Sequence, residues 1–285
     1  MATPPARATT TFVIGGDLTV HRLGFGAMRV TGAGVWGQPK DPVEAKLLLR
    51  RVISLGVDLI DTADSYGPEV SEQLIAEALH PYPADLVIAT KGGFTRPGPG
   101  RWHPDGRPSH LKQACEGSLR RLRLERIDLY QLHTVDDRVP FEESVGALAE
   151  LQSAGKIRHV GLSNVSAAQL KQARSIVPIV SVQNLYNLSD RSSEGVIAAC
   201  ERDGLGFIPW YPLAAGSLLN RRGTLARIAA RHQATPSQVA LAWLLQHSPA
   251  ILPIPGTSSI PHLEENVAAL EVTLDADDLR SLDTF

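Results

Sequence analysis

Short apolar runs recur along the chain, and most are nearly continuous rather than alternating with polar residues. A strand that is buried on both faces, as in a parallel sheet, has this character. Eight such runs predict strands: Leu23–Gly26, Leu59–Asp61, Leu86–Thr90, Asp128–Leu132, Val160–Leu162, Ile179–Gln183, Gly206–Trp210 and Ile251–Ile254. Residues 12–20 predict a small hairpin, because Gly15 and Gly16 can supply the positive φ angles of a tight primed turn.

Between these runs, apolar residues repeat at helical spacing. Helices are predicted over Pro42–Leu55, Val70–Leu79, Ser109–Arg123, Glu142–Ala154, Ser166–Arg174 and Ser193–Glu201, with a short one over Ala276–Phe285. Asp41 is the expected N-cap of the first helix, and Gly56 its C-terminal stop. Thr235-Pro-Ser-Gln238 has the form of a capping box and predicts a further helix.

Eight strands alternating with helices favour a (β/α)8 TIM barrel of the α/β class, with a short N-terminal β-hairpin, over an open sheet. No linker or change of composition divides the 285 residues, so one barrel domain is expected over 1–285, with 1–10 flexible. Two connections are long, Arg29–Lys40 and Gly92–Pro108. Both follow strands, and we therefore expect them on the C-terminal face, where barrels place their chemistry.

The composition narrows the possible partners. Lys and Arg number 28 and Asp and Glu number 30, for a net charge of −2, so no strong field points to nucleic acid or an anionic membrane. The nine His form no metal-binding tract. Cys115 and Cys200 lack CxxC spacing and are expected to be idle thiols, with a disulfide or a catalytic thiol as the alternative. The N-terminus has no apolar signal-peptide core and no run could span a bilayer, which predicts a cytoplasmic protein.

Four polar side chains lie at or just after the ends of neighbouring predicted strands: Asp61, Tyr66, Lys91 and His133. In a barrel, these strand ends converge on one rim. A free tyrosine has a pKa of about 10, and a nearby lysine ammonium lowers that pKa. The set therefore predicts a proton donor, in which Asp61 holds Lys91 and Tyr66 protonates a carbonyl oxygen as hydride reaches the carbon. His133 would orient that oxygen or share the proton.

Each of these residues has an ordinary explanation when taken alone. A strand-end Asp often caps a turn, and a loop Tyr is often half-buried packing. A Lys after a strand commonly faces solvent, and a strand-end His is commonly a core residue with satisfied hydrogen bonds. The combination at matching strand ends is what favours chemistry here.

Five motifs occur in order along the chain: Asp61-Thr-Ala-Asp-Ser-Tyr-Gly67, Thr90-Lys91, Asp128-Leu-Tyr-Gln-Leu-His133, Gly161-Leu-Ser-Asn164 and Ile254-Pro-Gly-Thr257. Together they resemble the aldo-keto reductase superfamily over roughly Arg22 to Leu282. Gly24-Phe-Gly-Ala-Met28 and Leu263-Glu-Glu-Asn266 look most like the bacterial branch that contains pyridoxal reductases. The resemblance implies carbonyl reduction with a nicotinamide cofactor and no metal, and a catalytic tetrad of Asp61, Tyr66, Lys91 and His133.

The resemblance also implies how the cofactor is held. Ser163, Asn164 and Gln183 would bind the nicotinamide carboxamide, which offers one acceptor and two donors. Trp210 would stack on the nicotinamide ring, unless it is simple barrel packing. Ser163-Asn164 can also be the N-cap of the next helix at the same time. Residues expected near the nicotinamide or the phosphates are Gly26 and Met28 after the first strand, Pro212, Leu213 and Gly216 after the seventh, and Gly256, Thr257 and Ser258 after the eighth.

The eighth-strand loop departs from the commoner family pattern. Many members place a Lys where Gly256 stands and an Arg where His262 stands, and both serve the adenosine 2′-phosphate. Residues 257–259, the helix N-terminus and His262 remain to bind that phosphate, and no acidic residue repels it. NADPH is therefore expected, with NADH the less favoured cofactor. Glu265 and Asn266 would face the adenine.

Three aromatic residues of the long connections, Trp36, Trp102 and His103, are expected to wall the substrate pocket with Met28 and Tyr66. The alternative is that the tryptophans only anchor their loops. A planar or apolar carbonyl compound would suit such walls, and pyridoxal is a candidate by resemblance. A monomer is favoured, since many such barrels work alone.

Two other functions stay open. A nucleotide-binding, redox-sensing regulatory subunit with little turnover would share the fold, although the chain has no long arm for docking. A metal-dependent barrel hydrolase would use Asp61, Asp64 and His133 as ligands, although the His-x-His pattern is absent.

Overall fold

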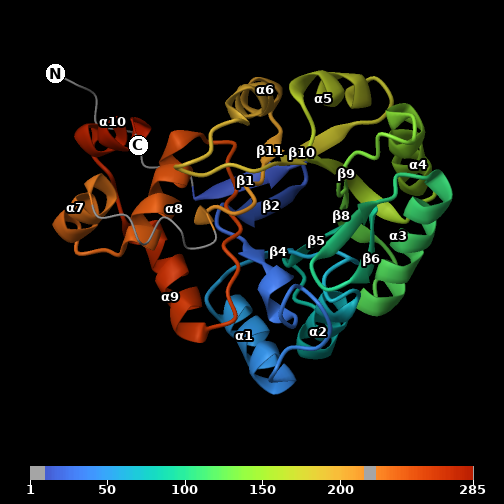
Figure 1. Cartoon of the computed structure of the whole chain (residues 1–285), viewed down its shortest axis with the longest axis horizontal. Coiled ribbons are helices and arrows are strands. Elements are labelled where there is room, and N and C mark those ends of the chain that lie inside the picture. Colours follow the sequence, from blue (N-terminus) through green and yellow to red (C-terminus); the bar gives the residue numbers. More distant parts are fainter. Residues whose placement is uncertain (1–9, 215–222, 285) are drawn as a thin grey trace.

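Seven parallel strands stand side by side in the order β11-β10-β9-β8-β5-β4-β3 (Figure 1). They are β3 Phe25–Gly26, β4 Leu59–Asp61, β5 Val87–Gly92, β8 Ile127–Leu132, β9 Ile157–Ser163, β10 Ile179–Gln183 and β11 Gly206–Phe207. The computed structural model from which they come describes residues 10–214 and 223–284. Gly26 pairs with Asp61 and Ser163 with Gln183. The carboxyl ends of the strands therefore share one rim.

The eighth apolar run closes the sheet into a barrel. Phe207 N donates to Ala250 O and Leu252 N to Phe207 O, both at 2.8 Å, and Gly24 N donates to Pro253 O at 2.9 Å. The extended residues 250–254 thus lie between β11 and the segment that leads into β3. The predicted (β/α)8 barrel is confirmed, although the pairing around Pro253, which has no N–H to donate, is too sparse to form a full strand.

The helices form a ring outside the strands (Figure 1). They are α1 Pro42–Ser54, α2 Val70–Leu79, α3 Pro108–Leu122, α4 Phe141–Ser153, α5 Ala167–Arg174, α6 Glu194–Asp203, α7 Thr224–Arg231, α8 Pro236–His247, α9 Ile260–Ala268 and α10 Ala276–Asp283, with 3-10 turns η1 Ala27–Val30 and η3 Ala269–Glu271. The predicted Asp41 cap is confirmed, because its Oδ1 accepts from Val43 N at 2.9 Å and Glu44 N at 3.0 Å. Among the helices in the described parts of the chain, none is both long and apolar enough to cross a membrane.

The predicted hairpin, β1 Thr11–Ile14 and β2 Leu18–His21, closes the opposite end of the barrel. Its buried residues Ile14, Leu18 and Val20 cluster with Leu59 and Val87, which are the first residues of β4 and β5. Apolar side chains therefore fill the amino-end of the barrel, and the carboxyl-end rim is left for polar groups.

The long connection after β5 differs from its expected form. It contains an antiparallel hairpin, β6 Phe94–Gly98 and β7 Arg101–Pro104, in which Thr95 pairs with His103. The Pro and Gly residues over 97–100 make this stretch look like a loop in sequence. A two-stranded ribbon has only edge strands, and these tolerate such residues. Helix α7 was also not expected.

The capping box of α8 gives a stability prediction. Thr235 Oγ1 accepts from Gln238 N at 3.2 Å and donates to Glu265 Oε1 at 2.6 Å. Thr235→Ala should lower the free energy of unfolding by about 1–2 kcal/mol in urea titrations, because an N-terminal donor of the helix loses its acceptor. Thr235→Ser keeps the hydroxyl and should stay within a few tenths of a kcal/mol. Equal losses in both variants would contradict this role of the cap.

Candidate active site

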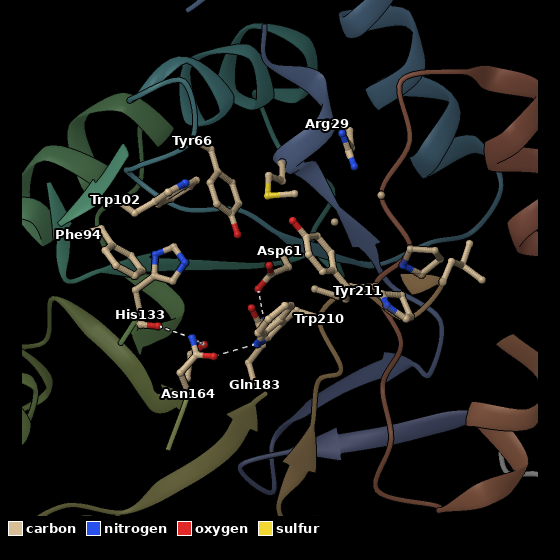
Figure 2. A pocket seen from close by; sticks show the side chains of 18 residues that line it. Arg29, Asp61, Tyr66, Phe94, Trp102, His133, Asn164, Gln183, Trp210 and Tyr211 are labelled. Carbon is tan, nitrogen blue, oxygen red and sulfur yellow. Dashed lines mark hydrogen bonds between the residues drawn. The ribbon is translucent and has the colours of Figure 1, made fainter. Parts of the chain in front are cut away.

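A cavity of about 410 Å³ opens at the carboxyl-end rim, a size common for small-molecule sites. Predicted site residues that line it are Gly26, Met28, Asp61, Tyr66, Trp102, His133, Ser163, Asn164, Gln183, Trp210, Pro212, Leu213 and Gly256. Figure 2 shows Tyr66, Trp102 and His133 on one side and Trp210 and Tyr211 across from them. Residues far apart in sequence thus meet at one cavity, as expected for converging strand ends.

A buried ion pair lies beneath this cavity. Lys91 Nζ donates to Asp61 Oδ1 at 2.6 Å and to Thr62 O at 2.8 Å, and the two side chains are 0% and 2% exposed. Asp61 Oδ2 accepts from Gln131 Nε2 at 3.1 Å and from Gln183 Nε2 at 2.8 Å. The remaining hydrogen-bonding capacity of both charges is therefore largely used, which is the condition for keeping such a pair in a protein interior.

Tyr66 lies above this pair, with Lys91 Nζ 5.2 Å from its ring centroid. Burial raises the pKa of Tyr66 above its usual 10.0, and the opposing effect of Lys91 does not cancel that rise. The expected acidifying effect of Lys91 is thus present but outweighed. Burial alone would lower the pKa of Lys91, but Asp61 and Tyr66 raise it above 10.5. Lysine is therefore charged and tyrosine is protonated, the states that a proton donor and its activator need.

His133 completes the group. Its ring centroid lies 5.8 Å from that of Tyr66 and 4.8 Å from that of Phe94, and its Nδ1 lies 3.3 Å from Ser65 Oγ. Burial, followed by the positive charges of Lys91 and Arg96, holds the pKa of His133 well below 6.5. A neutral imidazole with one N–H can donate a hydrogen bond to a carbonyl oxygen without adding a charge to the cavity.

The alternative metal site finds no support. In the described chain, residues 10–214 and 223–284, no group of three or more His, Cys, Asp or Glu is placed to hold a metal ion. Burial raises the pKa of Asp64 well above 3.8, so this carboxyl favours its protonated form. Asp61 is already engaged by Lys91 and two side-chain amides.

Across the cavity, Asn164 links three segments (Figure 2). Its Nδ2 donates to His133 O and its Oδ1 accepts from Trp210 Nε1, both at 3.0 Å. Its own N–H donates to Gln183 O at 3.0 Å. The residue has φ of +59°, which Asn tolerates better than most residues. Ser163, Asn164, Gln183 and Trp210 therefore form one continuous polar and aromatic wall.

Two glycines meet where the first and eighth strand ends touch. A Cβ on Gly26 would lie 2.7 Å from Ile254 O, and one on Gly256 would lie 2.5 Å from Gly26 O. Neither position can carry a side chain without moving backbone. In this backbone, glycine is therefore the residue that fits at position 256, where the commoner family pattern has a lysine.

Several predicted residues do not line the cavity: Lys91, Trp36, His103, Thr257, Ser258, His262, Glu265 and Asn266. Lys91 lies below its floor, and Trp36 faces Arg96 instead. Glu265 carries a hydrogen bond to Thr235 that supports the start of α8. Gly216 lies outside the residues that the structure describes. The roles expected of these positions toward the cofactor or substrate stay predictions.

Some cavity residues were not anticipated. Arg29, Phe94, Tyr211, Ile254 and Pro255 line it as well. Arg29 and Tyr211 directly follow predicted site segments, so sequence adjacency could have indicated them. Phe94 lies on the unexpected hairpin, and nothing in its local sequence marks it.

The chain matches the Aldo/keto reductase family over residues 22–285. It belongs to that family. A pyridoxine 4-dehydrogenase of Escherichia coli is 45% identical over 97% of this chain and 98% of its own length. An uncharacterised oxidoreductase of Schizosaccharomyces pombe is 50% identical over 94% of this chain and 87% of its own. A Klebsiella pneumoniae aldo/keto reductase solved with NADP and acetate has a TM-score of 0.83 at 29% identity, covering 97% of this chain and 95% of that one.

Family membership confirms the resemblance drawn from the motifs. This aldo-keto reductase is a nicotinamide-dependent oxidoreductase that acts by carbonyl reduction. The buried ion pair, the phenol above it and the neutral imidazole are the parts of its cavity suited to that chemistry.

The burial of His133 predicts a pH dependence of stability. Free imidazole binds a proton below about 6.5, whereas the folded group does so only at much lower pH. The unfolded state therefore binds the extra proton, and the free energy of unfolding falls as the pH drops below 6.5. Between pH 7 and 5.5, the free energy of unfolding of His133→Gln should fall by about 1 kcal/mol less than that of the wild type. Identical slopes in urea titrations of the two proteins would rule this contribution out.

Proposed function

We propose that this aldo-keto reductase uses NADPH to reduce an aldehyde or ketone to its alcohol, with Tyr66 as the proton donor and pyridoxal among its substrates. The observation that carries the proposal is the position of Tyr66 above the buried Lys91–Asp61 pair, in a cavity that also holds His133. Burial raises the pKa of Tyr66 and lowers that of His133, which favours a protonated phenol and a neutral imidazole. When bound, the reduced nicotinamide supplies the hydride.

The four tetrad residues have different roles at the carbonyl oxygen. His133 donates a hydrogen bond to that oxygen and fixes its position. Tyr66 gives up its phenolic proton to the oxygen as negative charge develops there. Lys91, held by Asp61, stabilises the phenolate that remains, and this electrostatic effect is strong because both charges are shielded from water.

The residues present fit a nicotinamide dinucleotide. Ser163, Asn164 and Gln183 offer hydroxyl and amide groups to the carboxamide, and Trp210 offers a ring for stacking. Gly26 and Gly256 bring the first and eighth strand ends close together at the edge of the cavity, where the cofactor would pass. Residues proposed for the phosphates are Pro212, Leu213, Gly216, Gly256, Thr257, Ser258 and His262, with Glu265 and Asn266 toward the adenine. Met28 lines the cavity and would contact the nicotinamide.

The choice of NADPH is supported by Arg29. Its side chain is exposed at the edge of the cavity, and a Cβ on Gly256 would lie 3.7 Å from Arg29 Cγ. A guanidinium beside this loop can supply the positive charge that Gly256 and His262 do not, and it can bind a phosphate through two parallel hydrogen bonds. The NADP complex of the Klebsiella relative agrees with this choice.

The aromatic side of the cavity supports a ring-bearing substrate. Trp102 and Phe94 line it next to Tyr66, with ring centroids of Trp102 and Tyr66 6.2 Å apart. Such a wall suits a planar carbonyl compound. The E. coli relative acts on pyridoxine according to its name, and it aligns with nearly the whole chain.

Tyr66→Phe tests the proton donor. It should lower kcat for pyridoxal about 10²–10⁴-fold, because the phenolic proton is lost. The Kd for NADPH, from fluorescence titration, should change less than about twofold. Tyr82→Phe, which removes a hydroxyl bonded to Leu122 O outside the cavity, is the matched control and should keep normal turnover. Full activity in Tyr66→Phe would end the assignment.

Arg29→Met tests the phosphate contact. The KM for NADPH should rise about tenfold, because a charged hydrogen bond to phosphate contributes roughly 1.4 kcal/mol. The value of kcat should change little, since Arg29 is not among the tetrad residues. Arg29→Lys should recover part of the loss. An unchanged KM in Arg29→Met would show that the cofactor does not use this cation.

A further inference from the structure

Arg96, on β6, contacts one wall of the cavity from outside. Its guanidinium carbon lies 3.6 Å from the ring centroid of Trp102 and 5.7 Å from that of Trp36. The first distance places the guanidinium directly over the indole ring, well inside the reach of about 6 Å for cation–π attraction. Trp102 lines the cavity, whereas Arg96 and Trp36 do not. Trp102 is thus held on one face by a charged group that the cavity does not expose.

The same guanidinium joins three separate segments. Nη1 donates to Ser65 O at 2.7 Å, Nη2 to Gly34 O at 3.2 Å and Nε to Arg101 O at 2.9 Å. These carbonyls belong to the loop that carries Tyr66, to the connection between η1 and α1, and to β7. A single side chain therefore ties together the loops that frame the aromatic side of the cavity.

Only the planar fork of arginine meets all of these demands. Donors must point at three carbonyl oxygens while the flat face of the group covers an indole. A lysine ammonium has three donors but no flat face, and it cannot span three acceptors in one plane. Substitution of Arg96, even by lysine, should therefore release Trp102.

Trp102 lies beside the space that a substrate ring would occupy. Its ring meets those of Tyr66 and His133 edge to face, each with centroids 6.2 Å apart, and that of Phe94 at 5.4 Å. A carbonyl oxygen held between Tyr66 and His133 leaves the rest of the molecule beside Trp102. A ring-bearing compound gains aromatic contact there, whereas a small aliphatic aldehyde has no surface with which to gain it.

We propose that Arg96 is a specificity-determining positioning residue, which fixes Trp102 as a rigid wall and thereby selects planar ring-bearing carbonyl compounds over small aliphatic ones. The proposal rests on the carbonyl reduction proposed above and adds where its substrate discrimination arises. Arg96 touches neither substrate nor cofactor and acts on substrate choice through Trp102. Its charge is the smallest of the three causes that lower the pKa of His133, so burial and Lys91 still keep that ring neutral when Arg96 is replaced.

The test compares kcat/KM for benzaldehyde and propanal in Arg96→Met, Arg96→Lys and the wild type. For benzaldehyde we expect kcat/KM to fall about tenfold, mainly through a higher KM. This loss corresponds to removing the cation–π contact between Arg96 and Trp102, which holds the Trp102 ring in place. For propanal the change should stay within about twofold, and the Kd for NADPH should not move. Arg101→Met removes the same charge from the exposed side of the hairpin and should keep the wild-type ratio.

A second measurement does not depend on activity. The chain has four Trp, so labelling with 5-fluorotryptophan gives four fluorine resonances, and Trp102→Phe identifies one of them. In Arg96→Met, the Trp102 resonance should broaden or shift toward the solvent-exposed value. If this occurs while the wild type reduces neither these aldehydes nor pyridoxal, the proposed function fails, whereas the fixing of Trp102 by Arg96 stands.

Three results would overturn the proposal. One is an equal loss for benzaldehyde and propanal, and another is an unchanged Trp102 resonance in Arg96→Met. The third comes from a Trp102→Leu background, where Arg96→Met should leave the benzaldehyde-to-propanal ratio unaltered. A further tenfold change there would mean that Arg96 acts on the substrate directly.

Discussion

Beneath the floor of the cavity, a lysine ammonium and an aspartate carboxylate lie 2.6 Å apart with almost no contact with water. Removing such charges from water costs several kcal/mol per ion, and this cost is offset only when the other hydrogen-bonding groups of both ions are satisfied. Here the partners are Thr62 O, Gln131 and Gln183. They come from the residue after β4, from β8 and from β10. The Lys91–Asp61 pair is therefore tolerated only in a barrel whose strands are in register.

The cavity combines this fixed floor with a wall made of loops. The floor is built from strand residues, and the hydrogen bonds of the parallel sheet fix their positions. The wall is built from Phe94 and Trp102 on the β6–β7 hairpin, which lies outside the main sheet. His133 stands at the junction, with its backbone N–H bonded to Gly92 O and its ring beside Phe94. The charged and hydrogen-bonded groups of the cavity thus belong to one part of the molecule, and its aromatic wall belongs to another.

The strands and helix starts that depend on neighbouring residues could be predicted from the sequence. Continuous apolar runs predicted the barrel strands, and Asp41 and Thr235 marked two helix starts, because burial and capping act within a few residues. Polar residues at strand ends predicted that Asp61, Tyr66, Lys91 and His133 lie close together, and their catalytic roles stay predictions. The contacts of Arg29 and Arg96 could not be predicted in this way, because each depends on neighbours distant in sequence. The pKa of Tyr66, which burial raises and Lys91 lowers, likewise depends on a three-dimensional environment.

The contact between Gly26 and Gly256 bears on attempts to redesign cofactor preference. Grafting a lysine into the eighth-strand loop would be the obvious way to strengthen NADPH selectivity. In this chain the graft would push a side chain into the Gly26 carbonyl, 2.5 Å from the new Cβ. The first and eighth strand ends would then have to separate, at the seam where the barrel closes. Engineering of nucleotide choice is therefore better directed at position 262 or 29, where exposed side chains can change without disturbing the seam.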